Sequence, residues 1–367
     1  MKIEIYSPTI RRKEMDAVLT AMVEEKIGPG DRNRLLIQTA KEQLKFDYAL
    51  ALRSPAVALH LALKALNAAP GKAVIISALS PSYYLQVLHD LQLTPLYCDV
   101  SYDFPCMSRE LVENAIAKKE AGLEICAIVL HHTLGYVPDS ASIVELGFPV
   151  IEDISQSYGF WLKSDNKKKD DDTEANDKES KKTEEAVPLS GIFCIIGLEE
   201  RDMLTSGGGA LLFAMNRKDS ALLRNFTGIA DEYCLPDINA ALAVVQFKDI
   251  ARNIERRRGI AQVVTQASLS LSARTKHKRF IPLENSEYCN YSFSLVLETG
   301  LKDVIAYAKK KEIEIENAFE KTIAGSGFAN DCPVSSSLVM RTVIFPMYPR
   351  LRSQDMERIS RLVMTLP

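Results

Sequence analysis

A carboxylate and an amide follow one of the most apolar runs of the chain. Asp153 stands near the end of the run 149–154, and Gln156 lies three residues further on. If this run is a strand of an open α/β sheet, both side chains lie at its carboxyl end, where such sheets bind ligands. An aspartate in this place also caps a following helix. The residues alone favour the cap, so a further argument is needed to assign chemistry.

A second candidate for chemistry lies before the helical pattern at 56–66, where Arg53, Ser54, Pro55 and Ala56 follow one another. The free N–H groups and the dipole of a helix N-terminus favour anions. Proline is acceptable in the first helical turn, but it removes one N–H donor. Arg53 and Ser54 retain the capacity to hold an anion, so we expect a weakened anion site here.

Metal and thiol chemistry find little support. Seven cysteines are scattered without a C-x-x-C pair, several of them inside apolar runs, which predicts buried reduced thiols. His131 and His132 form the one histidine pair, and adjacent residues of a strand point to opposite faces. We therefore expect no metal site.

The elements that would position these residues are strands alternating with helices. Apolar strand-like runs occur at 73–77, 95–100, 125–130, 149–154, 192–196 and 210–214. Helical patterns occur at 11–25, 35–44, 56–66, 84–91 and 109–118. Continuous apolar strands joined by helices predict an α/β fold with a mainly parallel sheet flanked by helices.

The remainder of the chain predicts a connector helix and a smaller α+β domain. Residues 236–258 have the pattern of one long amphipathic helix, and strands at 291–297 and 341–345 alternate with helices at 302–311 and from Ser353. We expect a large domain over 1–235, the connector over 236–258 and a small domain over 259–367. Residues 163–187 hold seven Lys and nine Asp/Glu, which predicts a disordered surface insertion within the large domain.

Composition excludes several classes of protein. The 367 residues carry a net charge of −3, from 45 Lys+Arg and 48 Asp+Glu, which argues against nucleic-acid binding. Apolar stretches fall far short of the roughly 20 residues that a bilayer requires. The first 15 residues lack the apolar core of a secretory signal. These features predict a cytoplasmic protein that binds neither nucleic acid nor membrane.

The order and spacing of several stretches resemble the DegT/StrS family of sugar aminotransferases, which are fold-type-I enzymes that use pyridoxal phosphate (PLP). The matching stretches are 7–22, 54–79, 94–100, 148–159, 204–213, 235–258 and 332–359. The resemblance implies a fold-type-I PLP-transferase-like architecture, a homodimer and a nucleotide-linked keto-sugar as ligand. It further implies cofactor-binding roles for Asp153 at the pyridinium nitrogen, Gln156 near the ring hydroxyl, Tyr83 as a substitute for the stacking group near Pro81, and Ser54, Ala56 and Thr205 around the phosphate.

The resemblance breaks at the lysine that would form the Schiff base with PLP. In the family this lysine lies nine residues before the alanine that follows the Gly-rich turn, and here that position is Arg201. No lysine occurs from Pro188 to Asn216. Arginine stays protonated and is not an amine nucleophile, so Arg201 cannot form an aldimine. The histidine of the related sugar dehydratases is absent as well.

Other family positions have changed in the same direction. Pro55-Ala56 replaces a Gly-Thr pair of the phosphate cup, Ile196 replaces a serine, and Glu232 replaces an asparagine that reaches the partner subunit's cofactor. We therefore predict that PLP binding is weak or lost. We also predict that Arg201 points into the old cofactor pocket, where it either pairs with an acid (Asp153, Glu200 or Glu232) or holds a small anion.

Two functions remain open. The first is a non-catalytic homologue of nucleotide-sugar aminotransferases in surface-polysaccharide or amino-sugar biosynthesis, with no catalytic residue of its own. The second is an aminotransferase or dehydratase-like enzyme that binds PLP or its amino form (PMP) without a covalent bond.

Overall fold

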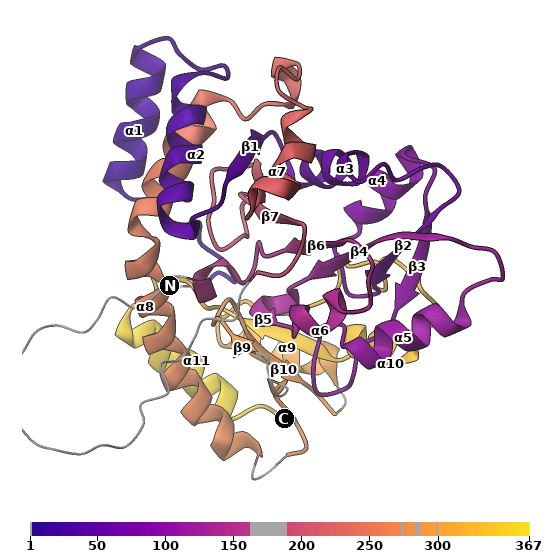
Figure 1. Cartoon of the computed structure of the whole chain (residues 1–367). Helices are drawn as coiled ribbons and strands as arrows, with labels where there is room; N and C mark the ends of the chain where they lie inside the picture. The colour runs from indigo at the N-terminus through magenta and orange to yellow at the C-terminus, as the bar shows by residue number, and fades with distance from the viewer. Residues whose placement is uncertain (1, 162–188, 273–274, 283–286, 299) are drawn as a thin grey trace, which may run out of the picture.

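The computed structural model describes residues 2–161, 189–272, 275–282, 287–298 and 300–367. The predicted charged insertion at 163–187 lies outside the described residues. Figure 1 shows a large α/β portion that contains most of the strands, and a smaller portion built from the C-terminal part of the chain.

A sheet of seven strands forms the centre of the large portion. The strand order is β1-β8-β7-β6-β4-β2-β3. The strands β7, β6, β4, β2 and β3 are parallel to one another. Only β8 runs antiparallel to β7 and β1. The predicted parallel sheet is thus confirmed, while β1 was not predicted. Its bounds and those of the other strands are β1 Tyr48–Leu52, β2 Ala73–Ser77, β3 Thr94–Cys98, β4 Ile125–His131, β6 Val150–Asp153, β7 Phe193–Gly197 and β8 Ala210–Ala214.

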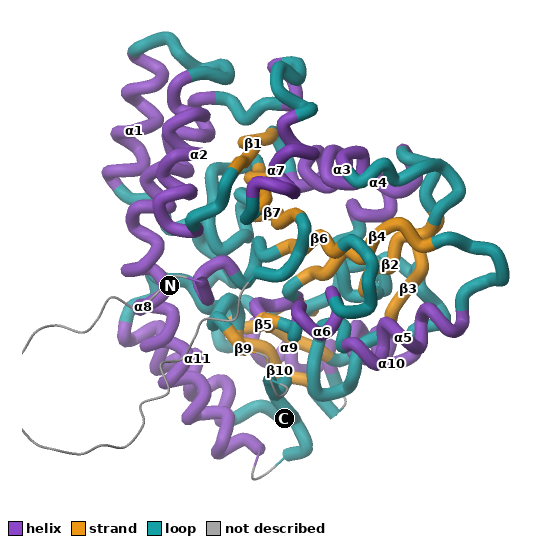
Figure 2. The backbone as a smooth tube through the Cα atoms, in the orientation of Figure 1, coloured by secondary structure: helices purple, strands orange, loops and turns teal. Residues whose placement is uncertain are grey.

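Helices cover both faces of this sheet (Figure 2). The central strands are almost entirely buried, which is typical of a parallel sheet covered on both sides. Alternate residues of one strand face opposite layers: Val74 and Ile76 pack in one apolar cluster, whereas Ala73 and Ile75 pack in another. The first cluster includes residues of α3 Pro55–Ala65 and α4 Tyr83–Asp90. On the other side lie α5 Arg109–Lys118, α6 Ser140–Val144 and α2 Asp31–Leu44.

One long helix links the two portions of the molecule. Helix α8 spans Asp237–Ser272, so it continues well past Arg258, where the sequence predicted its end. In Figure 1 its first half lies beside α1 Arg12–Val23 and α2, and its second half beside α11 Ser353–Met364. The continuation was missed because the basic cluster 256–258 resembles a helix C-terminus, yet Ile260 and Val264 are buried and extend the apolar face.

A three-stranded antiparallel sheet forms the smaller portion. Its order is β10-β12-β11. The elements here are β10 Phe293–Val296, α9 Leu301–Lys310, β11 Glu316–Asn317, α10 Pro333–Val339 and β12 Thr342–Phe345. Two strands, β5 Tyr136–Val137 and β9 Glu287–Tyr288, form a separate two-stranded sheet. Helix α7 spans Arg217–Arg224. The N-terminal segment reaches the smaller portion too, because Ile3 bridges Ile313.

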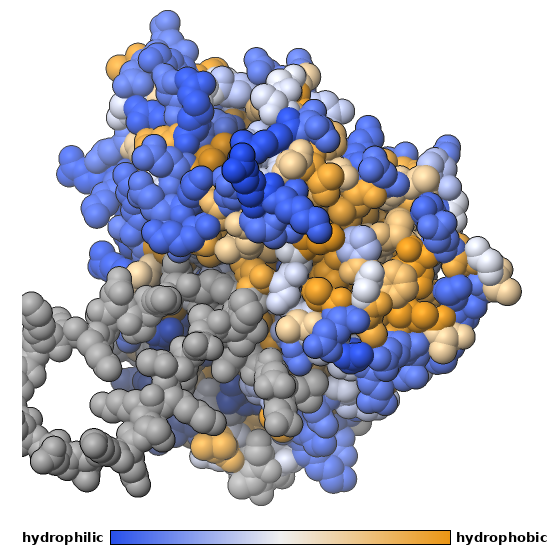
Figure 3. Space-filling view, in the orientation of Figure 1, coloured by the Kyte–Doolittle hydropathy of each residue, from blue (hydrophilic) through white to orange (hydrophobic). Residues whose placement is uncertain are grey.

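The surface of the molecule divides by polarity on the face drawn in Figure 3. Polar side chains cover α1 and α2, whereas apolar side chains gather over α3, α4 and the nearby strands. Within the described part of the chain, no helix combines the length and apolar character needed to cross a membrane.

Candidate functional site

A cavity of about 420 Å³ lies where the carboxyl ends of the parallel strands meet the smaller portion. The large sheet contributes residues that follow β2, β4, β6 and β7, and α8 contributes Arg257. Tyr6 of the N-terminal segment and residues 316–322 contribute from the opposite side. This volume falls within the range of small-molecule sites.

Asp153 ends β6 at the floor of this cavity and is 1% exposed. Its Oδ2 accepts a hydrogen bond from the Tyr84 hydroxyl at 2.7 Å and lies 3.4 Å from the Tyr83 hydroxyl. Its Oδ1 accepts from the Ser155 N–H at 3.1 Å and from the Ser155 hydroxyl. The carboxylate therefore lines the cavity and also closes a local turn with Ser155. The interpretation of Asp153 as a helix cap was wrong, because residues 155–157 form a turn and no helix starts directly after β6.

Gln156 and Tyr83, two of the residues expected to bind the cofactor, line the cavity as well. The Gln156 Oε1 accepts from the Leu134 N–H at 2.7 Å, which fixes the side chain against the loop after β4. Tyr84 was missed, although it neighbours Tyr83. Burial, followed by the charge of Asp153, raises the pKa of the Tyr84 hydroxyl, which therefore stays protonated and donates to that carboxylate.

Arg201 lines the cavity, but its acidic partner is none of the three that the sequence offered. The guanidinium forms an ion pair with Glu316 of β11, and the Tyr291 hydroxyl donates to the Arg201 carbonyl at 2.8 Å. The Arg201 side chain is 41% exposed, so it lies at the mouth of the cavity and is not fully buried. The predicted pairing of Arg201 with an acid in the cavity is confirmed, but the three candidate partners were wrong. Glu316 is brought there by the smaller portion, which local sequence patterns do not position.

Asp202 is a second carboxyl group beside Asp153 that the sequence did not single out. It lines the cavity, and its Oδ2 accepts from the Glu199 N–H at 2.9 Å. Burial raises the pKa of Asp202 to about 8, and the charges of Asp153 and Glu199 add to this effect. At neutral pH the cavity floor therefore combines Asp153 with a protonated Asp202.

The predicted anion site at the start of α3 only partly reaches the cavity. Pro55 is part of the cavity lining, whereas Ser54 and Ala56 are not. The Ser54 hydroxyl oxygen accepts from the Val57 N–H at 3.2 Å, so it serves as the N-cap of the helix. This bond fixes the Ser54 side chain at the helix N-terminus, outside the cavity lining.

The other predicted phosphate contacts also lie outside the lining. Thr205 is 3% exposed, and its Oγ1 accepts from the Gly207 N–H at 3.2 Å within the Gly-rich turn. Ile196 is fully buried in the core between the sheet and α8. Glu232 lies exposed in the short helix Asp231–Tyr233, away from the cavity of its own chain.

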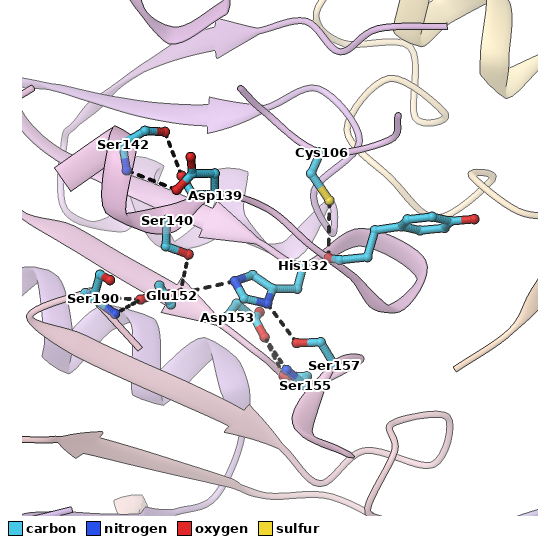
Figure 4. A network of polar contacts seen from close by, with 12 residues as sticks. Cys106, His132, Asp139, Ser140, Ser142, Glu152, Asp153, Ser155, Ser157 and Ser190 are labelled. Carbon is cyan, nitrogen blue, oxygen red and sulfur yellow. Dashed lines mark hydrogen bonds and ion pairs between the residues drawn. The ribbon is translucent and has the colours of Figure 1, made fainter. Parts of the chain in front are cut away.

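The two adjacent histidines point to opposite sides of β4, as predicted. His131 faces the cavity, its Nδ1 lies 3.0 Å from the Thr133 Oγ1, and burial lowers its pKa to about 4. His132 belongs to the buried network of Figure 4, where its Nε2 lies 3.2 Å from the Glu152 Oε2 and its Nδ1 2.8 Å from the Ser157 hydroxyl. This network stabilises the strand ends that carry Asp153. Among the described residues no group of three or more His, Cys, Asp or Glu could hold a metal ion.

Comparisons with known proteins find one matching family and several similar structures. The model of the DegT/DnrJ/EryC1/StrS aminotransferase family matches residues 8–169 and 212–364. An aminotransferase from Psychrobacter cryohalolentis has a TM-score of 0.80 at 17% identity, with 97% of this chain and 96% of that chain covered. A DegT DnrJ EryC1 StrS aminotransferase from Brucella abortus has a TM-score of 0.78 at 19% identity, with 96% and 94% covered. The PMP form of a putative sugar aminotransferase from Streptococcus pneumoniae has a TM-score of 0.82 at 16% identity, with 100% and 97% covered.

Proposed function

The chain belongs to the DegT/DnrJ/EryC1/StrS aminotransferase family, and from that membership we propose that it is a degenerate homologue of nucleotide-sugar aminotransferases. In this proposal the protein binds a small molecule in its cavity but does not transaminate. Its setting is amino-sugar or surface-polysaccharide biosynthesis in the cytoplasm.

Arg201 carries this proposal. It occupies the place of the Schiff-base lysine, nine residues before Ala210, and its charge is balanced by Glu316. A guanidinium does not act as an amine nucleophile, so no covalent link to PLP can form at this position. Instead, the ion pair of Arg201 with Glu316 links the loop after β7 to the smaller portion across the mouth of the cavity.

The residues around the start of α3 do not fit the phosphate of PLP. Pro55 offers no N–H, the Ser54 hydroxyl caps its own helix, and Ile196 is enclosed in the core without a polar group. Both oxygens of Asp153 accept hydrogen bonds from the protein. We therefore propose that PLP is not bound at physiological concentration.

One lysine among the lining residues still offers an amine. Lys321 is exposed, and its carbonyl accepts from the Ser82 N–H at 3.2 Å, so its backbone lies beside the loop after β2. A covalent link to PLP at Lys321 would contradict the proposed function. The alternative function, a PLP- or PMP-dependent enzyme that holds its cofactor without a covalent bond, does not need this amine. The retained trio of Asp153, Gln156 and Tyr83 is the observation that favours this alternative.

We also propose that the protein is a homodimer. Helix α1 exposes a row of large apolar side chains at helical spacing, which are Met15, Leu19, Met22 and Val23, each more than half exposed. A continuous apolar face of this kind is stabilised by a second copy of the chain.

The absorbance spectrum of the purified protein with micromolar PLP tests the proposal. We expect no visible aldimine band and no covalent pyridoxyl adduct after borohydride reduction, in the wild type and in Lys321→Met alike. A band that Lys321→Met abolishes would identify Lys321 as a functional amine and overturn the proposal. Amino-group transfer from an amino acid to a nucleotide-linked keto-sugar would overturn it as well.

A further inference from the structure

The same cavity is lined by a buried arginine, Arg257, to which the family resemblance gives no role. Arg257 of α8 is 5% exposed, and its Nη1 donates to the Tyr291 carbonyl at 2.7 Å and to the Met347 carbonyl. These two bonds hold the guanidinium in a fixed orientation. Its remaining N–H groups form no hydrogen bond with the described part of the chain, so they are available to a ligand.

The charge of Arg257 is not balanced by the protein. Among the described residues no carboxylate lies within ion-pair distance of it, in contrast to Arg201, which pairs with Glu316. Burial lowers the pKa of Arg257, while Tyr291 and Tyr6 act in the opposite direction. An arginine nevertheless stays charged in proteins. A buried unpaired cation is costly, so an anion that reached it would be bound favourably.

A hydroxyl group lies at the same end of the cavity as Arg257. Tyr6 lines the cavity, and its hydroxyl is close enough to the Arg257 guanidinium for the two groups to interact electrostatically. Burial raises the pKa of the Tyr6 hydroxyl, which therefore remains a proton donor. The neighbouring Ser292 hydroxyl oxygen is enclosed by protein atoms and does not reach the cavity.

We propose that Arg257 and Tyr6 form a binding subsite for the oxyanion of a monosaccharide-sized ligand, either a carboxylate or a phosphate. The planar guanidinium suits either group, because its paired N–H donors match two oxygens. This inference deepens the proposed function, since it names the ligand class for the same cavity.

Charge also orients the ligand within the cavity. Asp153 lies on the floor and Glu199 and Glu316 on other walls, and these carboxyl groups disfavour an anion near them. The anionic end of the ligand therefore goes to Arg257, and its neutral hydroxyl groups go to the acidic floor. Such an arrangement selects for a sugar that carries one oxyanion over an uncharged sugar.

Isothermal titration calorimetry of the full chain, without PLP, tests the subsite. The probes are inorganic phosphate, glucuronate as a sugar carboxylate and glucose as the uncharged control. We expect phosphate, glucuronate or both to bind, and glucose to bind at least tenfold more weakly than the anion that binds. If only one of the two anions binds, that result shows whether the subsite is specific for a phosphate or for a carboxylate. Absence of binding by both anions at millimolar concentration overturns the proposal.

Two variants and their matched controls locate the binding. Tyr6→Phe should weaken anion affinity about tenfold to a hundredfold, the usual contribution of a hydrogen bond to a charged group. Its Tm should stay nearly unchanged, because the aromatic ring is retained. The control Tyr102→Phe removes an exposed hydroxyl outside the cavity and should leave affinity unchanged.

Arg257→Gln should abolish anion binding, whereas Arg256→Gln, one residue earlier and outside the cavity, should not. Tyr6→Phe keeps the test decisive if Arg257→Gln fails to fold. Equal anion affinity in the wild type and Tyr6→Phe would refute the subsite. A visible PLP band in the wild type, together with anion binding that Tyr6→Phe weakens, would refute the proposed function and leave the oxyanion subsite intact.

Discussion

Replacing Arg201 by lysine restores the missing amine but should not restore an enzyme. The perturbation is mild for the fold, because the ion pair with Glu316 is partly exposed at 41% and 29% for the two side chains. Pairs of this kind contribute about 0–1 kcal/mol, and a lysine can still approach the same carboxylate. We therefore expect Arg201→Lys to fold with a nearly unchanged free energy of unfolding.

The affinity for PLP is the quantity that should stay low. Three donors expected of the family's phosphate cup are missing, namely the N–H at Pro55 and the hydroxyls at Ala56 and Ile196. Each charge-assisted hydrogen bond contributes about 1.5–3 kcal/mol. At about 1.4 kcal/mol per tenfold, the three losses weaken binding by about three to six orders of magnitude. The single variant should therefore stay colourless at micromolar PLP.

The assay is the visible spectrum followed by borohydride reduction and mass analysis. A combined variant that adds Pro55→Gly, Ala56→Thr, Ile196→Ser and Glu232→Asn should bind PLP more tightly than Arg201→Lys alone. Ile196 is fully buried, so its replacement by serine should cost about 2–5 kcal/mol, and folding must be checked by circular dichroism. An Arg201→Lys protein that turns yellow and transaminates a keto-sugar nucleotide would refute the reasoning.

Three further predictions address the insertion, the pH dependence and the assembly. Deletion of 166–184 should shift Tm by no more than a few degrees in calorimetry, because this charged stretch has almost no apolar side chains to bury; a larger loss would show that it packs on the core. His131 is buried with a pKa of about 4, so the folded state keeps it neutral while the unfolded chain binds a proton below about pH 6.5. Stability should therefore fall from about pH 6.5 towards pH 4 by up to about 1.4 kcal/mol per pH unit, and urea denaturation of His131→Gln should lack this component. The double variant Leu19→Glu, Met22→Glu on α1 should be monomeric in light scattering, whereas a wild type that is itself monomeric at micromolar concentration would contradict the homodimer.

Local patterns were sufficient for most of the architecture. The apolar runs at 73–77 and 210–214 are β2 and β8 without any change of boundary, and 109–118 is α5. These elements were predictable because strand and helix periodicity is a property of neighbouring residues. β1 (Tyr48–Leu52) was not predicted, and it becomes a strand by pairing with β8 at the edge of the sheet.

The sequence also shows that residues 188–216 contain no lysine and that Asp153 lies near the end of an apolar run, because both depend on the order of residues along one segment. The partners of these residues could not be predicted from it. Glu316 pairs with Arg201, and Tyr6 lies near Arg257, only because the N-terminal segment, α8 and the smaller portion converge on one cavity. Contacts between residues so far apart in the chain depend on how whole elements pack, and neither propensity nor periodicity encodes that packing. The sequence by itself determined which chemistry the Arg201 position cannot perform, and the tertiary structure decided which charges are balanced and which one remains available to a ligand.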